Sequence, residues 1–292
     1  MDSGLQKILA NHKTTSNDYT HLSYSPSSKW SIPSTKLSEF YSTYCRLISE
    51  NPQGNYYLGE KKQNEAPICL KFTLRFEDKS GLENLYNSDF ITSVVFYTQQ
   101  AISEFLHISD SKLELICCVL EPEEAYTEAE VVCIQIALQF PLCCCDLSIQ
   151  SQSIRSKLVQ LLRNNRVSMS LAKVPINEWD NALENISNDW PLYGSTTSPG
   201  QAKLTQLTIY QNLDGAESAE TIELAEIFTP LNHSDVSEKG VIPSEMFINN
   251  GEIDYQYWLP LFLSMSYCRG VTLPKGDVMT RAIASESLNM DN

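Results

Sequence analysis

Alternation between hydrophobic and polar positions predicts strands in several stretches of the chain. The clearest is PICLKFTLRF, residues 67–76, where every second side chain is apolar. A repeat of two residues places one set of side chains, Ile68, Leu70, Phe72, Leu74 and Phe76, opposite the other set, Cys69, Lys71, Thr73 and Arg75. VVCIQIALQF (131–140) alternates in the same way, and LTQLTIY (204–210) is also strand-like. LELICCVL (113–120) is nearly all apolar, as expected of a strand buried on both faces.

Apolar residues spaced three and four apart predict helices between these strands. Such stripes run over residues 36–50, 89–106 and 151–164, and YWLPLFLSMSYC (257–268) is an apolar helical segment. Thr35 is a candidate cap for the first helix, and Asn87 or Ser88 for the second. Strands interleaved with helices predict an α/β (α+β) fold, in which a central mixed sheet is flanked by helices.

Composition along the chain predicts one core with polar flanks. Residues 1–34 are a polar lead-in rich in Ser and Thr, and residues 35–211 contain most of the predicted helices and strands. Residues 212–274 comprise an acidic loop region and the closing helix, which we expect to pack on the core. Residues 275–292 form a polar tail.

The chain is strongly acidic. Its 292 residues include 21 Lys plus Arg and 36 Asp plus Glu, a formal net charge of −15 at pH 7. Such a surface repels nucleic-acid phosphates over most of its extent, so protein partners are favoured and nucleic-acid binding would need a local basic groove. Solubility alone explains the charge equally well. No apolar run reaches the ~18–20 residues of a membrane helix, and the amino terminus lacks the pattern of a signal peptide.

Nine cysteines without a secretory signal predict a reducing, intracellular location and free thiols. Cys143 and Cys145 come nearest to the spacing of zinc ligands, but only as C-x-C, and the four histidines stand outside this cluster. The sequence therefore favours buried thiols over structural zinc.

Common catalytic motifs are absent from the sequence. It contains no G-x-x-x-x-G-K-[ST] phosphate loop, no G-x-G-x-x-G, no H-E-x-x-H and no G-x-S-x-G. Arg155, Lys157, Arg163 and Arg166 form either a small phosphate-facing patch or an ordinary soluble helix face.

Five segments, taken in order, carry the motifs of one enzyme family. They are KWSIPSTKLSEFYSTYCRLI (29–48), YLGEKKQNEAPICLKFTLRF (57–76), VVCIQIALQFP (131–141), WDNALENISNDWPLYGSTTSPGQAKLTQLTIY (179–210) and YWLPLFLSMSY (257–267). Together they resemble the amino-terminal primase domain of the primase–helicases of large nucleocytoplasmic (giant) DNA viruses, a member of the archaeo-eukaryotic primase superfamily. W-x-x-Y-G-S and the strand ending in x-L-R-F are the most specific of these motifs.

The resemblance implies a metal-dependent nucleotidyl-transfer site, and this chain departs from it at most of the matching positions. Lys71 and Thr73 stand where the family has its two metal-binding Asp, Ala137 where it has a His, and Thr197 where a Lys follows Y-G-S. Asp180 alone could serve as the third acidic ligand. Two-metal transfer needs several carboxylates, and a Lys among them repels the cation. The resemblance thus implies a degenerate site without metal or cofactor, although Lys71 could still attract a phosphate group.

The sequence therefore predicts a catalytically inactive, primase-like viral protein that acts as an interaction or structural component. Its partners would be other viral proteins of a replication complex or a virion, and its location the host cytoplasm or the virion. One alternative is an active DNA primase or polymerase that binds Mg²⁺ or Mn²⁺ through relocated ligands such as Glu77, Asp78 and Asp180. Another alternative is an unrelated, acidic α/β binding protein.

Overall fold

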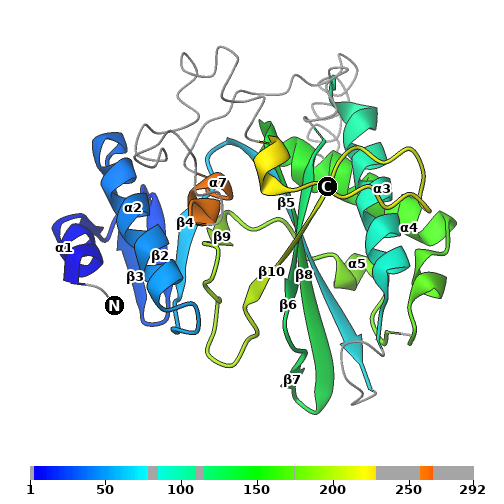
Figure 1. The fold of residues 1–292 in the computed structure, drawn as a ribbon, viewed down its shortest axis with the longest axis horizontal. Coiled ribbons are helices and arrows are strands. Elements are labelled where there is room, and N and C mark those ends of the chain that lie inside the picture. Colours follow the sequence, from blue (N-terminus) through cyan, green and yellow to red (C-terminus); the bar gives the residue numbers. More distant parts are fainter. Residues whose placement is uncertain (1–2, 78–84, 109–114, 174, 228–256, 266–292) are drawn as a thin grey trace, which may run out of the picture.

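The fold is a mixed α/β arrangement, as the sequence predicts (Figure 1). It was obtained as a computed structural model, which describes residues 3–77, 85–108, 115–173, 175–227 and 257–265. The helical elements are α1 (Ser3–Asn11), α2 (Ser34–Glu50), α3 (Ser88–Phe105), the π-helix η2 (Ile149–Ile154), α4 (Arg155–Asn164), the 3₁₀-helix η3 (Val167–Ser170), α5 (Trp179–Ala182) and α7 (Leu259–Phe262). The strands are β1 (Lys13–Thr14), β2 (His21–Tyr24), β3 (Ser27–Trp30), β4 (Leu58–Lys61), β5 (Glu65–Phe76), β6 (Cys117–Pro122), β7 (Tyr126–Glu128), β8 (Val131–Asp146), β9 (Asp189–Pro191) and β10 (Leu204–Tyr210).

The described strands form two antiparallel sheets. One sheet has the order β1-β3-β2-β4-β9, and the other has the order β10-β6-β8-β5, with β7 paired to β8. In Figure 1, α1 and α2 lie beside the first sheet and α3 and α4 beside the second. The sequence predicts a central mixed sheet flanked by helices. The second sheet has that flanked position, but its strand pairs are antiparallel rather than mixed, and the division into two sheets is additional.

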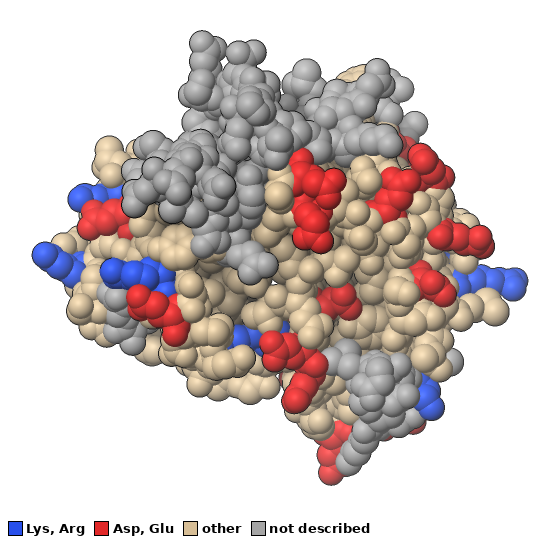
Figure 2. Space-filling view, viewed as in Figure 1, with Lys and Arg blue, Asp and Glu red and all other residues tan. Residues whose placement is uncertain are grey.

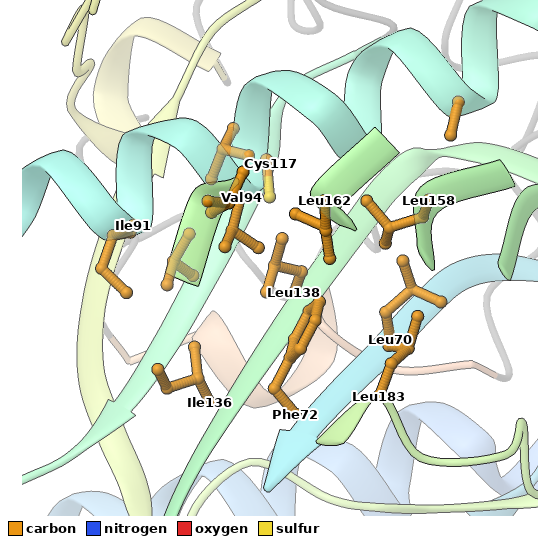
Figure 3. Close-up of a cluster of buried hydrophobic side chains, with 14 of the residues drawn as sticks. Leu70, Phe72, Ile91, Val94, Cys117, Ile136, Leu138, Leu158, Leu162 and Leu183 are labelled. Carbon is orange, nitrogen blue, oxygen red and sulfur yellow. The ribbon is translucent and has the colours of Figure 1, made fainter. Parts of the chain in front are cut away.

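Strand β5 separates two hydrophobic clusters, as its alternation predicts. Its apolar face packs with α3, α4 and β8, and Figure 3 shows Leu70 and Phe72 beside Leu138 and Leu158 in this cluster. Cys69, on the opposite face, belongs to a second cluster that includes α2 and α7. β6 contributes side chains to both clusters, which confirms that it is buried on both faces. Each face of the second sheet is therefore covered.

The three helices predicted before residue 165 are present with small changes at their ends. Asn87 caps α3, because its side chain accepts a hydrogen bond from the backbone N–H of Phe90 at 3.0 Å. Thr35 does not cap α2. The helix begins at Ser34, so Thr35 lies within its first turn, and Pro33 occupies the cap position without a side-chain hydrogen bond. The predicted helix 151–164 is a π-helical turn followed by α4.

The amino-terminal lead-in differs most from the prediction. Residues of α1 pack in the second cluster, and β2 pairs with both β3 and β4. Residues 3–30 therefore supply three strands of the first sheet and a helix, α1, that packs in the second cluster. Their short, Ser-rich strands gain stability from pairing along the sheet, which a local hydrophobic pattern does not reveal.

The closing segment, residues 257–265, packs on the core. Gln139 of β8 donates a hydrogen bond from Nε2 to the carbonyl of Leu263 at 2.7 Å, and Tyr257 donates one to the carbonyl of Ser42 at 3.2 Å. The predicted helix 257–268 is shorter, since α7 spans four residues. The rest of the acidic region, residues 228–256, and the predicted tail 275–292 lie outside the described residues.

Candidate functional site

The site predicted from the sequence begins on the face of β5 that carries Cys69, opposite the face of Leu70 and Phe72. Lys71 and Thr73 lie two residues apart and share this face. β5 pairs with β8 so that Lys71 is opposite Ala137 and Thr73 opposite Gln135. Ala137 is 1% exposed and packs in the second cluster. The structure thus brings three of the predicted positions, 71, 73 and 137, to one region of the sheet.

One carboxylate, which the sequence did not single out, contacts both Lys71 and Thr73. Lys71 Nζ lies 2.9 Å from Glu184 Oε2, and Thr73 donates a hydrogen bond from Oγ1 to Glu184 Oε1 at 2.5 Å. The two oxygens of Glu184 are therefore shared between an ammonium and a hydroxyl. We call this set Lys71–Thr73–Glu184 the β5 clamp.

Glu184 is positioned by a segment that pairs with β5. The β5 strand ends its sheet, and the segment carrying Glu184 runs along the edge that β8 does not cover. The backbone N–H of Glu184 donates to the carbonyl of Lys71 at 2.9 Å, and Leu183 forms an antiparallel bridge with Phe72. Leu183 also joins the apolar cluster below the strand (Figure 3). Backbone pairing and burial together fix the Glu184 side chain above Lys71 and Thr73.

Arg155 of α4 holds the same segment from the other side. Its guanidinium donates hydrogen bonds to the carbonyls of Asp180, Leu183 and Glu184, at 2.7, 2.6 and 3.2 Å. Asp180 lies within the four-residue helix α5, and Leu183 and Glu184 directly follow it, so these carbonyls are at a short helix whose backbone acceptors lack helical partners. The sequence offered two interpretations of Arg155, a phosphate-facing patch or an ordinary soluble helix face. The structure instead gives it a structural contact with the segment that carries Glu184.

Asp180 does not join the β5 clamp. It lies in the first turn of α5, and its carboxylate is paired with Arg163, which also contacts Glu178 at 3.3 Å. The structure therefore does not bring Asp180, the candidate third acidic ligand, to positions 71 and 73: the carboxylate that contacts Lys71 is that of Glu184. Asp180 and Glu184 both belong to the stretch WDNALENISNDW. The sequence does not show which of the two side chains lies beside β5.

A cavity of about 200 Å³ adjoins the β5 clamp. Lys71 and Glu184 line one part of it, and Thr197, another predicted position, lines it as well. Thr197 donates a hydrogen bond from Oγ1 to Gln201 Oε1 at 2.5 Å. The remaining lining residues include Tyr24, Lys62, Asp189 and Trp190.

Lys62 is the most unusual side chain of this cavity. It is 4% exposed, and its Nζ has no hydrogen-bond partner among the described residues. The amine lies 4.9 Å from the centre of the Trp190 ring, at the distance of a cation–π contact. Burial lowers the pKa of Lys62 below its ordinary value. Sequence reasoning missed this residue, because the polar stretch GEKK (59–62) gives no sign that Glu60 and Lys62 are buried.

The described residues do not fit a divalent metal ion. They contain no group of three or more His, Cys, Asp and Glu side chains arranged to hold one. Mg²⁺ and Mn²⁺ require several oxygen ligands, whereas the β5 clamp offers one carboxylate already paired with an ammonium. Of the relocated ligands considered above, Glu77 is exposed at the end of β5 and Asp78 lies outside the described residues. Every cysteine that the structure describes is buried, and none of them forms a disulfide.

An α/β fold with two antiparallel sheets, and a strand that presents positions 71 and 73 beside a returning acidic segment, is consistent with a primase-like core. The family model described as the C962R protein N-terminal AEP domain matches residues 20–210, about two thirds of the chain. The chain belongs to this family of archaeo-eukaryotic primase domains from viral primase–helicases. The resemblance carried by the sequence motifs is thereby confirmed. No curated protein matches the chain.

Proposed function

We propose that this protein is a catalytically inactive member of its primase family that acts through binding to other proteins. The β5 clamp is the observation that carries this proposal. At the two positions where the family motif has metal-binding carboxylates, this chain has an ammonium and a hydroxyl, and both are joined to Glu184.

The charge at this place opposes metal-dependent chemistry. Nucleotidyl transfer of the two-metal type depends on carboxylates that hold two cations between the attacking hydroxyl and the phosphates. Here a cation would have to displace Lys71 from Glu184 and then remain close to its positive charge. Repulsion between a divalent ion and an ammonium grows as the dielectric constant falls, so partial burial of the clamp makes the arrangement less favourable still.

Features of the surface support a role in protein binding. Met169 is 73% exposed and Ile176 is 51% exposed, two large apolar side chains that a protein partner could cover. Met169 lines a cavity of about 410 Å³ together with Trp179 and Arg166. In the view of Figure 2, acidic side chains are spread across the described surface, while basic ones lie mostly toward its margins. Such a surface suits a partner with a basic surface and apolar side chains, for example another component of a viral replication complex or virion.

A primer-synthesis assay tests the loss of catalysis. The full chain is incubated with a single-stranded template, nucleoside triphosphates and either Mg²⁺ or Mn²⁺, in parallel with the Glu184→Gln variant. We expect no template-dependent product above the protein-free control from either protein. Metal-dependent synthesis by the natural chain that disappears in Glu184→Gln would overturn the proposal and establish an active primase with an altered ligand set.

A further inference from the structure

We propose that the cavity lined by Lys62, Lys71 and Thr197 is a metal-independent binding site for a phosphate group. The inference rests on the proposed function, because it assumes that amines rather than metal ions supply the positive charge there. It specifies phosphate binding without a metal ion, and it adds a residue, Lys62, that the family motifs do not assign.

Lys62 provides the main argument. Ammonium groups in protein interiors are paired, since burying an unpaired charge is costly. Yet Lys62 is 4% exposed, and among the described residues its Nζ has no hydrogen-bond acceptor. The Trp190 ring at 4.9 Å stabilises positive charge but accepts no conventional hydrogen bond. An ammonium with three unused donors at the wall of this cavity needs an acceptor, and an oxyanion provides several.

Neither carboxylate that lines the cavity is a hydrogen-bond partner of Lys62 Nζ. Glu184 is paired with Lys71 and also accepts from Thr73. Asp189 accepts a hydrogen bond from the Tyr19 hydroxyl at 2.8 Å. Lys71 has three N–H donors, so that its contact with Glu184 leaves donors for a ligand. An incoming anion would thus have two amines to bind and carboxylates that are already hydrogen-bonded.

The size of the cavity indicates a small group. Its volume of about 200 Å³ corresponds to roughly seven water molecules at about 30 Å³ each. Pockets for drug-sized ligands are larger, roughly 300–1,000 Å³. The space accommodates a phosphate group, and the hydroxyl-bearing residues Tyr24 and Thr197 line it. An entire nucleoside triphosphate would extend beyond it.

Isothermal titration calorimetry with inorganic phosphate tests the proposal directly. The full chain is titrated in a chloride buffer with excess EDTA, which removes divalent metals. We expect saturable binding of one phosphate per chain. Lys62→Met should weaken it by about tenfold or more, as expected for loss of a charge-assisted hydrogen bond, and Lys71→Met should weaken it as well. Titration with a nucleoside 5′-monophosphate identifies the source of the phosphate: tighter binding than inorganic phosphate indicates a nucleotide, and weaker binding indicates the free ion.

Lys61→Met is the matched control. Lys61 precedes Lys62 in the chain, but its Nζ donates to the carbonyl of Asn17 at 2.8 Å, and it does not line the cavity. This variant should bind phosphate as the natural chain does. Absence of saturable binding to the natural chain, or equal affinities in the Lys61 and Lys62 variants, would overturn the inference. These outcomes leave the proposed function intact, because that proposal depends on primer synthesis with metal and not on phosphate binding without it.

Discussion

The Nζ atom of Lys71 lies 2.9 Å from Oε2 of Glu184, although 113 positions separate the two residues in the chain (184 − 71). The second oxygen of the same carboxylate accepts a hydrogen bond from Thr73. One acidic side chain therefore satisfies both residues at the positions of the family's metal-binding Asp pair. The contact also joins β5 to the segment that covers its edge. The positions that hold metal ligands in the family therefore contribute here to the stability of the fold.

Glu184→Gln should weaken the fold modestly. The variant keeps a partner for Thr73 but removes the charge that faces Lys71. The side chains of Lys71 and Glu184 are 18% and 33% exposed, so solvent screens the pair in part, and we expect a loss of about 1 kcal/mol in the free energy of unfolding. Urea denaturation at low and high salt measures it, and the loss should shrink at high salt.

Glu39→Gln is a suitable control for this experiment. Glu39 pairs with Lys36 at 2.8 Å on an open helix surface, where the two side chains are 55% and 51% exposed. Its replacement should leave the unfolding midpoint unchanged. Equal effects of the two substitutions would show that the β5 clamp is an ordinary surface ion pair.

Lys71→Asp combined with Thr73→Asp should create a metal site. The double variant would place two carboxylates on one face of β5 beside Glu184, and three carboxylates repel one another until a cation joins them. Without metal, the variant should therefore unfold at a lower temperature than the natural chain, and Mn²⁺ should raise that temperature. Thermal unfolding with and without Mn²⁺ measures both effects. The neutral pair Lys71→Asn with Thr73→Asn should show no such dependence on Mn²⁺, and a response equal to that of the Asp pair would contradict the assignment of this site.

Much of the β5 region was predictable, because period-2 alternation reports directly on which face of a strand is buried. It placed Phe72 in one cluster and Cys69 in the other, and it placed Lys71 and Thr73 together. Lys62 was not accessible to this reasoning, because LGEKK (58–62) has no hydrophobic alternation and the burial of Glu60 and Lys62 appears only in the structure.

The origin of the carboxylate in the β5 clamp was not predictable from local pattern. Asp180 and Glu184 are four residues apart in a polar stretch, and the choice between them depends on where α5 ends and on pairing of Leu183 with Phe72. Such contacts are long-range, so no local propensity encodes them. The strands of residues 13–30 were missed for the same reason: β2 is fixed by its neighbours β3 and β4 rather than by its own four residues.

His21 should make the fold sensitive to acid. It is 1% exposed, and its ring packs against Phe40 with the centroids 4.5 Å apart. Burial lowers its pKa from 6.5 to about 4 despite the opposing effect of Glu60, so His21 is neutral at pH 7 and its 3.7 Å contact with Glu60 is not an ion pair there. Between pH 6.5 and 4 the unfolded chain binds a proton that the folded chain does not, so stability falls as the pH falls, by up to about 3 kcal/mol.

The variant His21→Leu isolates this contribution. It retains Glu60 and removes the titrating ring, so its free energy of unfolding should change less between pH 7 and pH 4 than that of the natural chain. Denaturant unfolding at a series of pH values provides the comparison. His107→Gln, a change at an exposed position, should leave the acid sensitivity as it is. An unchanged pH dependence in His21→Leu would assign the effect to other groups.

Lys62→Met should stabilise the fold at neutral pH, and the gain should shrink in alkaline solution. Burial lowers the pKa of Lys62 below 10.5. In the pH range between the pKa of Lys62 in the folded chain and 10.5, the unfolded chain therefore binds more protons than the folded chain. The stability of the natural protein rises with pH over this range. Met fills similar space without an unpaired amine, and we expect a gain of roughly 1 kcal/mol at pH 7, offset in part by the lost contact with Trp190. Urea unfolding from pH 7 to pH 10 in phosphate-free buffer measures the difference, with Lys61→Met as the matched control. A difference between Lys62→Met and the natural chain that stays constant over this range would show that Lys62 keeps an ordinary pKa and is hydrated within the cavity.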